Sequence, residues 1–462
     1  MRLKRLYSGL LALGLSCSVL FQTPVLAAEE TAADTAQAAT SAITTNSIPG
    51  WPQGPEITST AAVIMEDSTQ TMLYSKNMDQ ELYPGATVKV MTVLVALENS
   101  QLTDEVTMTE TGVSGVTDGG ANISAQLGEV FTMEQCLYAI MLSSANDIAL
   151  QVAEHVGGSV ENFVQMMNDR AAQLGCTNTV FTKSTGLPDE NQHTTAHDMA
   201  LIMKAAIDNE SFRTISNTVS YTIPATNVSG GERVLTNNFP LMSSSNAAYY
   251  QYCLGGREGY TEASGSTLVC VAEKDDVTLI AVVLQGASGV TTTEAVSLFN
   301  YGFDNFQMLS LGDNDFNMVS GGNVYVPVGA TADSLTTEDG EEQENGQYSR
   351  QYFFGGTPVG TATMAATHED NSSFSTESNQ NIEAAREYSA DRNNLPYILF
   401  GGAGLILFLL LLWRIIKVAN RNCSVPSQLR VKIHSNFFTS HKPENQRCAL
   451  KHPLIFWFYS FV

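Results

Sequence analysis

Short apolar runs open and close the central part of the chain, and longer periodic runs lie between them. Apolar-rich runs at residues 61–66 and 71–75 flank a polar turn and predict a hairpin. Two later runs, at residues 266–273 and 277–284, predict a second hairpin. Strands at both ends of a domain with helices between them favour an α/β domain built on one antiparallel sheet covered by helices.

The stretch between the two hairpins carries helix signals. Residues 87–97 are apolar almost all round, which is typical of a buried helix. Hydroxyl side chains before periodic apolar positions predict further helix starts at Thr132 (a capping box with Gln135), Ser159 and Thr195. We also expect a helix after a break at 143–146 and another over 293–306.

The two ends of the chain differ in amino-acid composition from its centre. Residues 1–27 have a basic start, an apolar run and a small-residue end, which is typical of a cleaved secretory signal peptide. Residues 28–56, rich in Ala, Thr, Ser and Pro, are interpreted as a linker. The uncharged run within 395–416 is long enough to cross a bilayer. Basic residues follow it, so the positive-inside rule predicts a single-pass cell-membrane protein with residues 417–462 in the cytoplasm.

Two segments lie between the predicted main domain, 57–306, and that transmembrane helix. Residues 307–364 contain a few strand-like pieces, and we expect a small β appendage there. Residues 365–394 are rich in Ser, Asn and Glu and are interpreted as an acidic stalk.

Charge narrows the function classes. The 462 residues carry a formal net charge of −24, and residues 28–396 hold 12 basic and 46 acidic side chains. An exported body this acidic would repel phosphate backbones, which excludes nucleic acid as a partner. His193 and His197 straddle the cap at Thr195 and lack an obvious third ligand, so we predict no metal site, and no pattern indicates a cofactor.

Four cysteines, Cys136, Cys176, Cys253 and Cys270, would lie in the export compartment. Cys253 with Cys270 is a candidate cross-strand disulfide, and four cysteines could form two bridges. Unpaired buried thiols are at least as consistent with a domain of this size, and we favour them.

Several motifs follow one another in a fixed order. They are Pro84-Gly-Ala-Thr-Val-Lys-Val-Met-Thr92, Ser144-Ala-Asn-Asp147, residues 181–188 and 194–200, and Gly256-Arg-Glu-Gly-Tyr-Thr261. Together they resemble the serine-type D-alanyl-D-alanine carboxypeptidases, the low-molecular-mass penicillin-binding proteins that trim peptidoglycan stem peptides. The resemblance, from about residue 61 to 306, implies a β-lactamase/transpeptidase-like fold and peptidoglycan or cell-wall peptides as partners.

The resemblance also implies roles. In the family a serine at a helix start attacks the carbonyl, a lysine one turn later takes its proton, and backbone N–H groups form an oxyanion hole. By position, Lys89 matches the base, Ser144 and Asn146 match the Ser-x-Asn pair, and Gly259 matches the glycine of a Lys-Thr-Gly strand motif.

Two positions depart from the family pattern. Ala86 stands where the nucleophilic serine belongs, and Thr87 is one residue too late on the helix to replace it. In the family the Lys-Thr-Gly motif binds the terminal carboxylate of the substrate, and here Arg257 and Glu258 replace its Lys-Thr. Arg257 could still pair with a carboxylate. Two like charges 4 Å apart repel by about 4 kcal/mol at an effective dielectric of 20, so Glu258 should disfavour a substrate carboxylate.

We therefore expect a catalytically impaired relative with a cell-wall binding or scaffolding role. The alternative is an active or weakly active D-Ala-D-Ala carboxypeptidase in peptidoglycan maturation. The paired changes also suggest that Lys89 stays protonated and forms an ion pair with Glu258.

Overall fold

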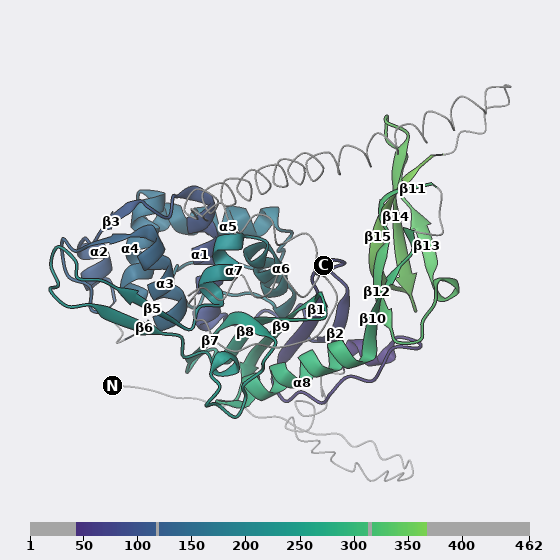
Figure 1. The fold of residues 1–462 in the computed structure, drawn as a ribbon, viewed down its shortest axis with the longest axis horizontal. Helices are drawn as coiled ribbons and strands as arrows, with labels where there is room; N and C mark the ends of the chain where they lie inside the picture. The colour runs from purple at the N-terminus through teal and green to yellow at the C-terminus, as the bar shows by residue number, and fades with distance from the viewer. Residues whose placement is uncertain (1–42, 117–119, 313–316, 367–462) are drawn as a thin grey trace, which may run out of the picture. The chain divides into compact units, whose positions relative to one another are not determined.

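The computed structural model describes residues 43–116, 120–312 and 317–366 (Figure 1). They belong to one compact unit, residues 1–367, and a second unit, 368–462, lies outside the described residues. The predicted signal peptide, transmembrane helix and cytoplasmic tail therefore also lie outside them, as does nearly all of the predicted stalk. Within the described ranges, no helix is long and apolar enough to cross a membrane.

A five-stranded antiparallel sheet forms the centre of the fold, in the order β2-β1-β9-β8-β7. Its strands are β1 (Ala61–Glu66), β2 (Met72–Lys76), β7 (Cys253–Thr261), β8 (Gly265–Lys274) and β9 (Val277–Gly286). Both predicted hairpins are confirmed. The N-terminal strand β1 pairs with β9, so the two hairpins close into one sheet and leave β7 at its edge.

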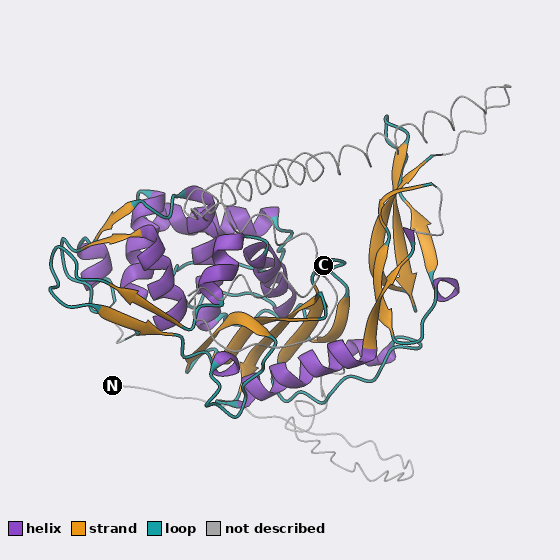
Figure 2. Cartoon of the chain, viewed as in Figure 1, coloured by secondary structure: helices purple, strands orange, loops and turns teal. Residues whose placement is uncertain are grey.

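Helices cover both faces of this sheet (Figure 2). Helix α6 packs on β1 and β9 from one side, and α8 packs on β8 and β9 from the other. Side chains alternate accordingly along β1: Val63 and Met65 join the core under α6, and Ala62 and Ile64 join the core under α8. The helices are α1 (Lys89–Asn99), α2 (Glu110–Ser114), α3 (Met133–Ser143), α4 (Asn146–Gly157), α5 (Val160–Gln173), α6 (Ala196–Ile207), α7 (Glu210–Ser216) and α8 (Val290–Asn305).

The predicted helix caps are confirmed. Thr132 accepts a hydrogen bond from the Gln135 backbone in a complete capping box, and the Ser159 and Thr195 side chains accept from the third residue after each cap. The sequence pattern missed α2, α7 and two short strand pairs, because segments this short show no clear period. The strand pairs are β3 (Glu105–Thr107) with β4 (Val130–Thr132), and β5 (Ser220–Ile223) with β6 (Arg233–Thr236).

The linker prediction is wrong for residues 43–56. Trp51 is buried there, donates a 2.7 Å hydrogen bond to the Leu73 carbonyl and stacks edge-on against Phe306. A short 3-10 helix, η1 (Thr44–Ser47), lies beside β2. One large aromatic side chain buried against the sheet is enough to fix a Pro- and Gly-rich segment that composition alone presents as a linker.

Residues 306–365 hold more strand than the few pieces predicted. Strands β10 (Phe306–Ser310) and β12 (Asn323–Pro327) form a pair. A four-stranded sheet has the order β11-β15-β14-β13, made by Met318–Gly321, Thr357–Ala365, Gln347–Phe354 and Thr336–Asp339. Tyr325 from β12 stacks on Phe306, so this region shares the aromatic core at the end of α8.

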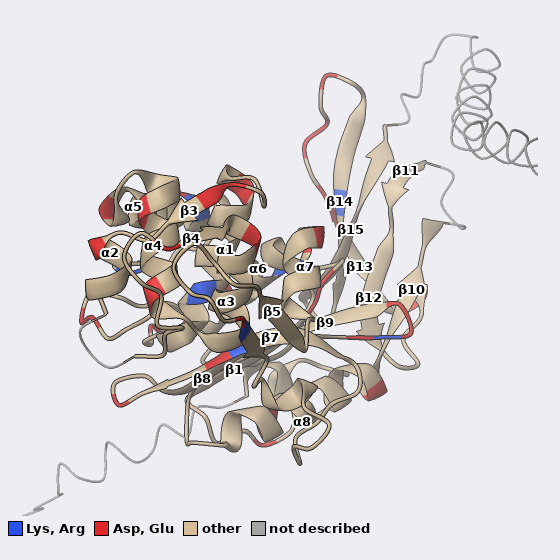
Figure 3. Ribbon diagram, turned by 60° about the vertical axis from the view of Figure 1, so that its left-hand side comes forward, with Lys and Arg blue, Asp and Glu red and all other residues tan. Residues whose placement is uncertain are grey.

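The distribution of charge and the unpaired state of the cysteines agree with the expectations from the sequence. Acidic side chains are spread over the helices and turns of the described chain, and basic ones are few (Figure 3). The four described cysteines are all buried free thiols, which confirms the favoured alternative. Cys270 lies opposite Gly256 and Cys253 lies opposite Ala272, so the two thiols are not cross-strand partners.

Candidate active site

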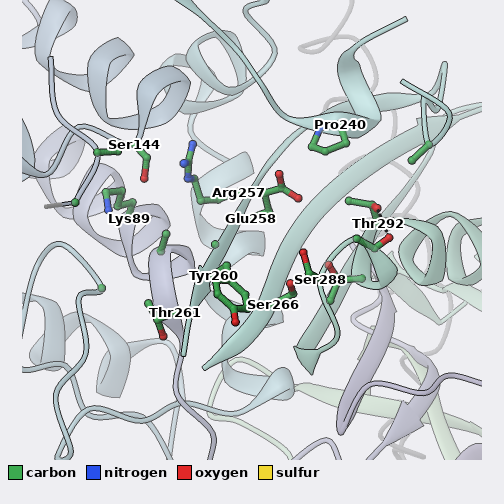
Figure 4. A pocket seen from close by; sticks show the side chains of 18 of the residues that line it. Lys89, Ser144, Pro240, Arg257, Glu258, Tyr260, Thr261, Ser266, Ser288 and Thr292 are labelled. Carbon is green, nitrogen blue, oxygen red and sulfur yellow. Dashed lines mark hydrogen bonds between the residues drawn. The ribbon is translucent and has the colours of Figure 1, made fainter. Parts of the chain in front are cut away.

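All seven residues predicted for the site line one pocket of about 680 Å³ (Figure 4). They come from the start of α1, the α3–α4 junction and the edge strand β7, three segments far apart in the sequence. They are Ala86, Lys89, Ser144, Asn146, Arg257, Glu258 and Gly259. The structure therefore brings together the seven residues that the family resemblance implies.

Ala86 and Lys89 lie on one face of the chain as it enters α1. The segment Gly85–Val88 is a 3-10 turn, η2, and α1 begins at Lys89. In a 3-10 turn, side chains three residues apart lie above one another, so the residue 86 and residue 89 side chains share the pocket. Only a methyl group occupies position 86.

Thr87 does not replace the missing hydroxyl. Its side chain is fully buried, and its Oγ1 donates a 2.7 Å hydrogen bond to the Pro84 carbonyl. It does not line the pocket. The hydroxyl caps its own turn, as expected for a side chain rotated by one residue from the functional face.

Lys89 is buried, and both of its hydrogen-bond partners are neutral. Its Nζ donates to Asn146 Oδ1 at 2.7 Å and to the Thr185 carbonyl oxygen. Burial, together with the nearby positive charge of Arg257, holds the pKa of Lys89 well below its ordinary value. The expected ion pair with Glu258 is therefore wrong: none forms in the structure, and the environment favours the uncharged amine.

Residues 181–188 close the pocket beside α1, a contribution that the sequence analysis did not assign. Besides the Thr185 carbonyl, the Ser184 carbonyl accepts a 2.7 Å hydrogen bond from Thr92 Oγ1. Gly186 follows in a left-handed conformation with φ +78°, and an added Cβ would lie 2.0 Å from the Gly85 carbonyl oxygen. The Thr-Gly pair could have suggested a tight turn, but not which helix it meets.

The Ser-x-Asn pair lies at the junction of α3 and α4. Ser144 ends α3 in a left-handed conformation with φ 55°, which turns the chain so that Asn146 begins α4 with its side chain against Lys89. Asp147 is buried behind this pair, and its carboxylate accepts from the backbone N–H groups of Ile123 and Ala125. These hydrogen bonds of Asp147 fix the α3–α4 junction. No other described side chain hydrogen-bonds to the Ser144 hydroxyl.

Arg257 and Glu258 point to opposite sides of the edge strand (Figure 4). Arg257 Nη1 donates a 2.6 Å hydrogen bond to the Met141 carbonyl on α3, and burial lowers its pKa to about 10. Burial raises the pKa of the Glu258 carboxyl, and the Arg257 charge opposes that shift only in part. Among the described residues, no group forms a hydrogen bond or ion pair with Glu258.

Gly259 brings the edge strand against the start of α1. A Cβ added there would lie 2.6 Å from the Ala86 Cβ and 2.7 Å from the Ala86 backbone nitrogen. Only glycine permits this approach, which places the Ala86 amide beside the strand, where the family resemblance implies an oxyanion hole. Within the described residues, no group of three or more His, Cys, Asp or Glu could hold a metal ion.

A buried lysine at the first turn of a core helix, a Ser-x-Asn junction facing it and a glycine-bearing edge strand define the class of penicillin-binding, serine-type acyl-transfer proteins. The comparisons agree. A family model described as D-alanyl-D-alanine carboxypeptidase matches residues 48–288, just over half of the chain. The chain belongs to the D-alanyl-D-alanine carboxypeptidase family.

Curated relatives carry the same name. The chain is 33% identical over 261 residues to D-alanyl-D-alanine carboxypeptidase DacB2 of Mycobacterium tuberculosis, a match that spans 54% of this chain and 84% of the relative. It is 32% identical over 233 residues to D-alanyl-D-alanine carboxypeptidase DacF of Bacillus subtilis. That match spans 49% of this chain and only 57% of the B. subtilis protein.

Solved structures give the same architecture. A D-alanyl-D-alanine carboxypeptidase from M. tuberculosis superposes with a TM-score of 0.51 at 27% identity, covering 56% of this chain and 95% of that one. Penicillin-binding protein 6B of Escherichia coli superposes with a TM-score of 0.57, covering 69% of this chain and 98% of that one. At 22% identity the second likeness supports the fold alone.

Proposed function

We propose that this chain binds cell-wall peptides without cleaving them. The observation that carries the proposal is Ala86, a methyl group at the position that faces both Lys89 and the pocket. A methyl group cannot form the acyl-enzyme on which a serine-type mechanism depends. Removing the nucleophile of a comparable serine hydrolase costs about 10⁶ in rate, so any remaining turnover would be very slow.

The proposal includes the predicted membrane tether. An exported acidic body, a single helix within 395–416 and a basic tail, 417–462, in the cytoplasm would hold the pocket at the cell-wall side of the membrane. An epitope tag inserted directly after residue 27, behind the predicted cleavage site, and a second tag at the C-terminus, combined with protease treatment of intact cells, test this orientation. Loss of the N-terminal tag with protection of the C-terminal one is the expected result, and the reverse pattern contradicts it.

A sedimentation experiment with two readouts tests binding without cleavage. The full-length protein is incubated with purified peptidoglycan sacculi, and both co-sedimenting protein and released D-alanine are measured. We expect protein in the pellet and D-alanine at the level of a protein-free control. Ala86→Ser, run beside it, should release D-alanine and so shows that the assay can detect turnover.

A weak hydrolase is the second candidate, and the lowered pKa of Lys89 favours it. An uncharged amine next to Ser144 could accept a proton from that hydroxyl or from water. In that case the unmodified protein would release D-alanine, and Lys89→Met or Ser144→Ala would abolish the release. Release that survives both substitutions would be a contaminant.

A further inference from the structure

The pocket continues past the edge strand into a second lobe. Arg257 lies on the same side of β7 as Lys89, and Glu258 points away from them towards Pro240 and Thr292 (Figure 4). Neighbouring residues on a strand face opposite ways, so Arg257 faces the part of the pocket around Lys89, and Glu258 faces the part beyond the strand. The lobe around Glu258 is called the glutamate lobe below.

Glu258 enters this lobe without a partner. It is half-buried, and no described side chain or backbone N–H lies within hydrogen-bond distance of its carboxylate. A carboxylate that has lost part of its hydration and gained no donor is unfavourable in the empty pocket. A ligand that brings N–H donors and a positive charge would remove that penalty.

Two buried hydroxyls line the same pocket. Ser266 is 7% exposed and Thr291 is 2% exposed, and both side chains border the pocket. Neither hydroxyl has a hydrogen-bond partner within the part of the chain that the structure describes. Each can accept one N–H through its oxygen. Together with the Glu258 carboxylate, these hydroxyls give the pocket three acceptor groups without a partner among the described residues, and a primary ammonium group has three donors.

The start of α8 also borders this lobe, and its partial positive charge disfavours a bound cation. The helix begins after Gly289 with no side-chain cap and no acidic residue in its first turn. Its N-terminus is equivalent to about half a positive charge, against the full negative charge of an ionised Glu258. Arg257 adds a full positive charge, but it lies across the strand with its Nη1 donating to the Met141 carbonyl. Glu258 is the charged side chain that faces the lobe itself, so the lobe favours a cation.

We propose that the glutamate lobe binds a primary ammonium group of a peptide-like ligand through Glu258, Ser266 and Thr291. The pocket then favours a ligand whose end is positively charged over one that ends in a free carboxylate. This inference rests on the proposed function of binding without cleavage and names the chemistry of the ligand. It assigns Glu258 a direct contact in place of the neutral hydroxyl that the family motif implies.

Two matched ligands test the proposal. One is N-acetyl-D-alanyl-D-alanine, and the other is the same molecule with its terminal carboxylate replaced by an aminomethyl group. Binding of each to the full-length protein is measured by ligand-observed NMR titration, which suits weak complexes. We expect the amine to bind at least about tenfold more tightly than the carboxylate, the size of one charge-assisted contact.

Three variants test which residues cause the preference for the amine. Glu258→Gln keeps the shape of the side chain and removes its charge, and it should reduce the amine preference about tenfold. Glu262→Gln makes the same charge change at an exposed position in the β7–β8 turn, outside the pocket, and should leave the preference unchanged. Ser266→Ala tests the lobe by a second route, with an expected severalfold loss for the amine alone.

Equal binding of the two ligands, tighter binding of the carboxylate, or binding of neither overturns the proposal. An amine preference that persists in Glu258→Gln also overturns it. Intact-protein mass and ligand integrity are checked in the same samples. A covalent adduct or cleaved ligand would refute binding without cleavage, and an absent preference with intact ligand would refute only the ammonium subsite.

Discussion

The helix side and the strand side of the pocket differ in how well their polar groups are satisfied. On the helix side, Lys89 donates to two acceptors, Asn146 and the Thr185 carbonyl, and the Ser184 carbonyl accepts from Thr92. On the strand side, Arg257 Nε is buried with no partner among the described residues, and Glu258 has none either.

The difference separates what this relative has kept from what it has changed. Two acceptors match the two N–H donors of an uncharged lysine amine, whereas an ammonium group has three donors. The helix side therefore retains the arrangement of a proton acceptor, although Ala86 supplies no proton to accept. The strand side carries the substituted charges and the unsatisfied atoms, so a ligand has most to gain there.

The largest expected effect comes from restoring the nucleophile. Ala86→Ser should form a covalent adduct with fluorescent penicillin. A hydroxyl at position 86 would face Lys89, whose lowered pKa favours the uncharged amine that can accept a proton. The nucleophile is worth about 10⁶ in rate. Adding Glu258→Thr should raise the rate further, by up to about 10³ if the full repulsion of about 4 kcal/mol is removed.

Lys89→Met in the Ala86→Ser background should abolish the adduct and is the control for the lysine's role. If Ala86→Ser gains nothing even with Glu258→Thr, the helix side does not retain a working geometry. The helix side would then have lost its function as well as the strand side.

Gly186→Ala probes the contact that holds residues 181–188 against the start of α1. Its Cβ would lie 2.0 Å from the Gly85 carbonyl oxygen in a left-handed conformation, so we expect a loss of about 2–5 kcal/mol in unfolding free energy. Gly175→Ala is the matched control, since its φ is +83° but nothing lies within 4 Å of the added Cβ. Denaturant unfolding of both variants measures the difference, and equal losses would show that the close approach contributes nothing.

The pH dependence of stability tests the charge state of Lys89. Its folded pKa lies well below the ordinary value of 10.5, so between these two values the unfolded chain binds a proton that the folded protein lacks. The free energy of unfolding should therefore rise with pH through that window, by up to about 1.4 kcal/mol per pH unit. Below the folded pKa, this contribution to the slope disappears.

The measurement compares denaturant unfolding of the unmodified protein and of Lys89→Met at pH 7, 8 and 9. The variant lacks the titrating amine and should show a smaller slope, while other titrating groups affect both proteins alike. Parallel curves would mean that Lys89 stays protonated, as the sequence alone had suggested.

Thr87→Val gives the smallest expected effect. It removes the hydrogen bond from Thr87 Oγ1 to the Pro84 carbonyl and should cost about 1 kcal/mol of stability. In the Ala86→Ser background, penicillin labelling should be unchanged, because this hydroxyl does not face the pocket. Reduced labelling in a protein that melts at the same temperature would give Thr87 a part in the chemistry.

Pattern reasoning from the sequence recovers the sheet and the capped helices, and the family resemblance supplies the seven pocket residues. Periodic apolar runs and hydroxyl caps are local signals, and the motif order carries the long-range information. Pattern reasoning fails where one contact between distant segments fixes the local structure. Trp51 fixes a segment that looks like a linker, and the Thr185 carbonyl binds Lys89 through a backbone atom that no sequence pattern reveals.

The electrostatics of the site show the same limit. From the sequence, a lysine and a new glutamate suggest an ion pair. In the structure, the edge strand turns Glu258 away from Lys89 and leaves Arg257 on the lysine's side, so the pKa of Lys89 falls instead of staying high. Which face of a strand a charge occupies depends on register, and a single residue reverses it.

Alanine at residue 86 leaves the pocket without a hydroxyl at the position of the family nucleophile. Intact-protein mass spectrometry of the unmodified full-length chain after prolonged exposure to penicillin tests it most directly, with Ala86→Ser treated in parallel. We expect an unchanged mass for the unmodified chain and the mass of one added penicillin for the variant. One penicillin added to the unmodified chain would show that another residue of this pocket forms the acyl-enzyme.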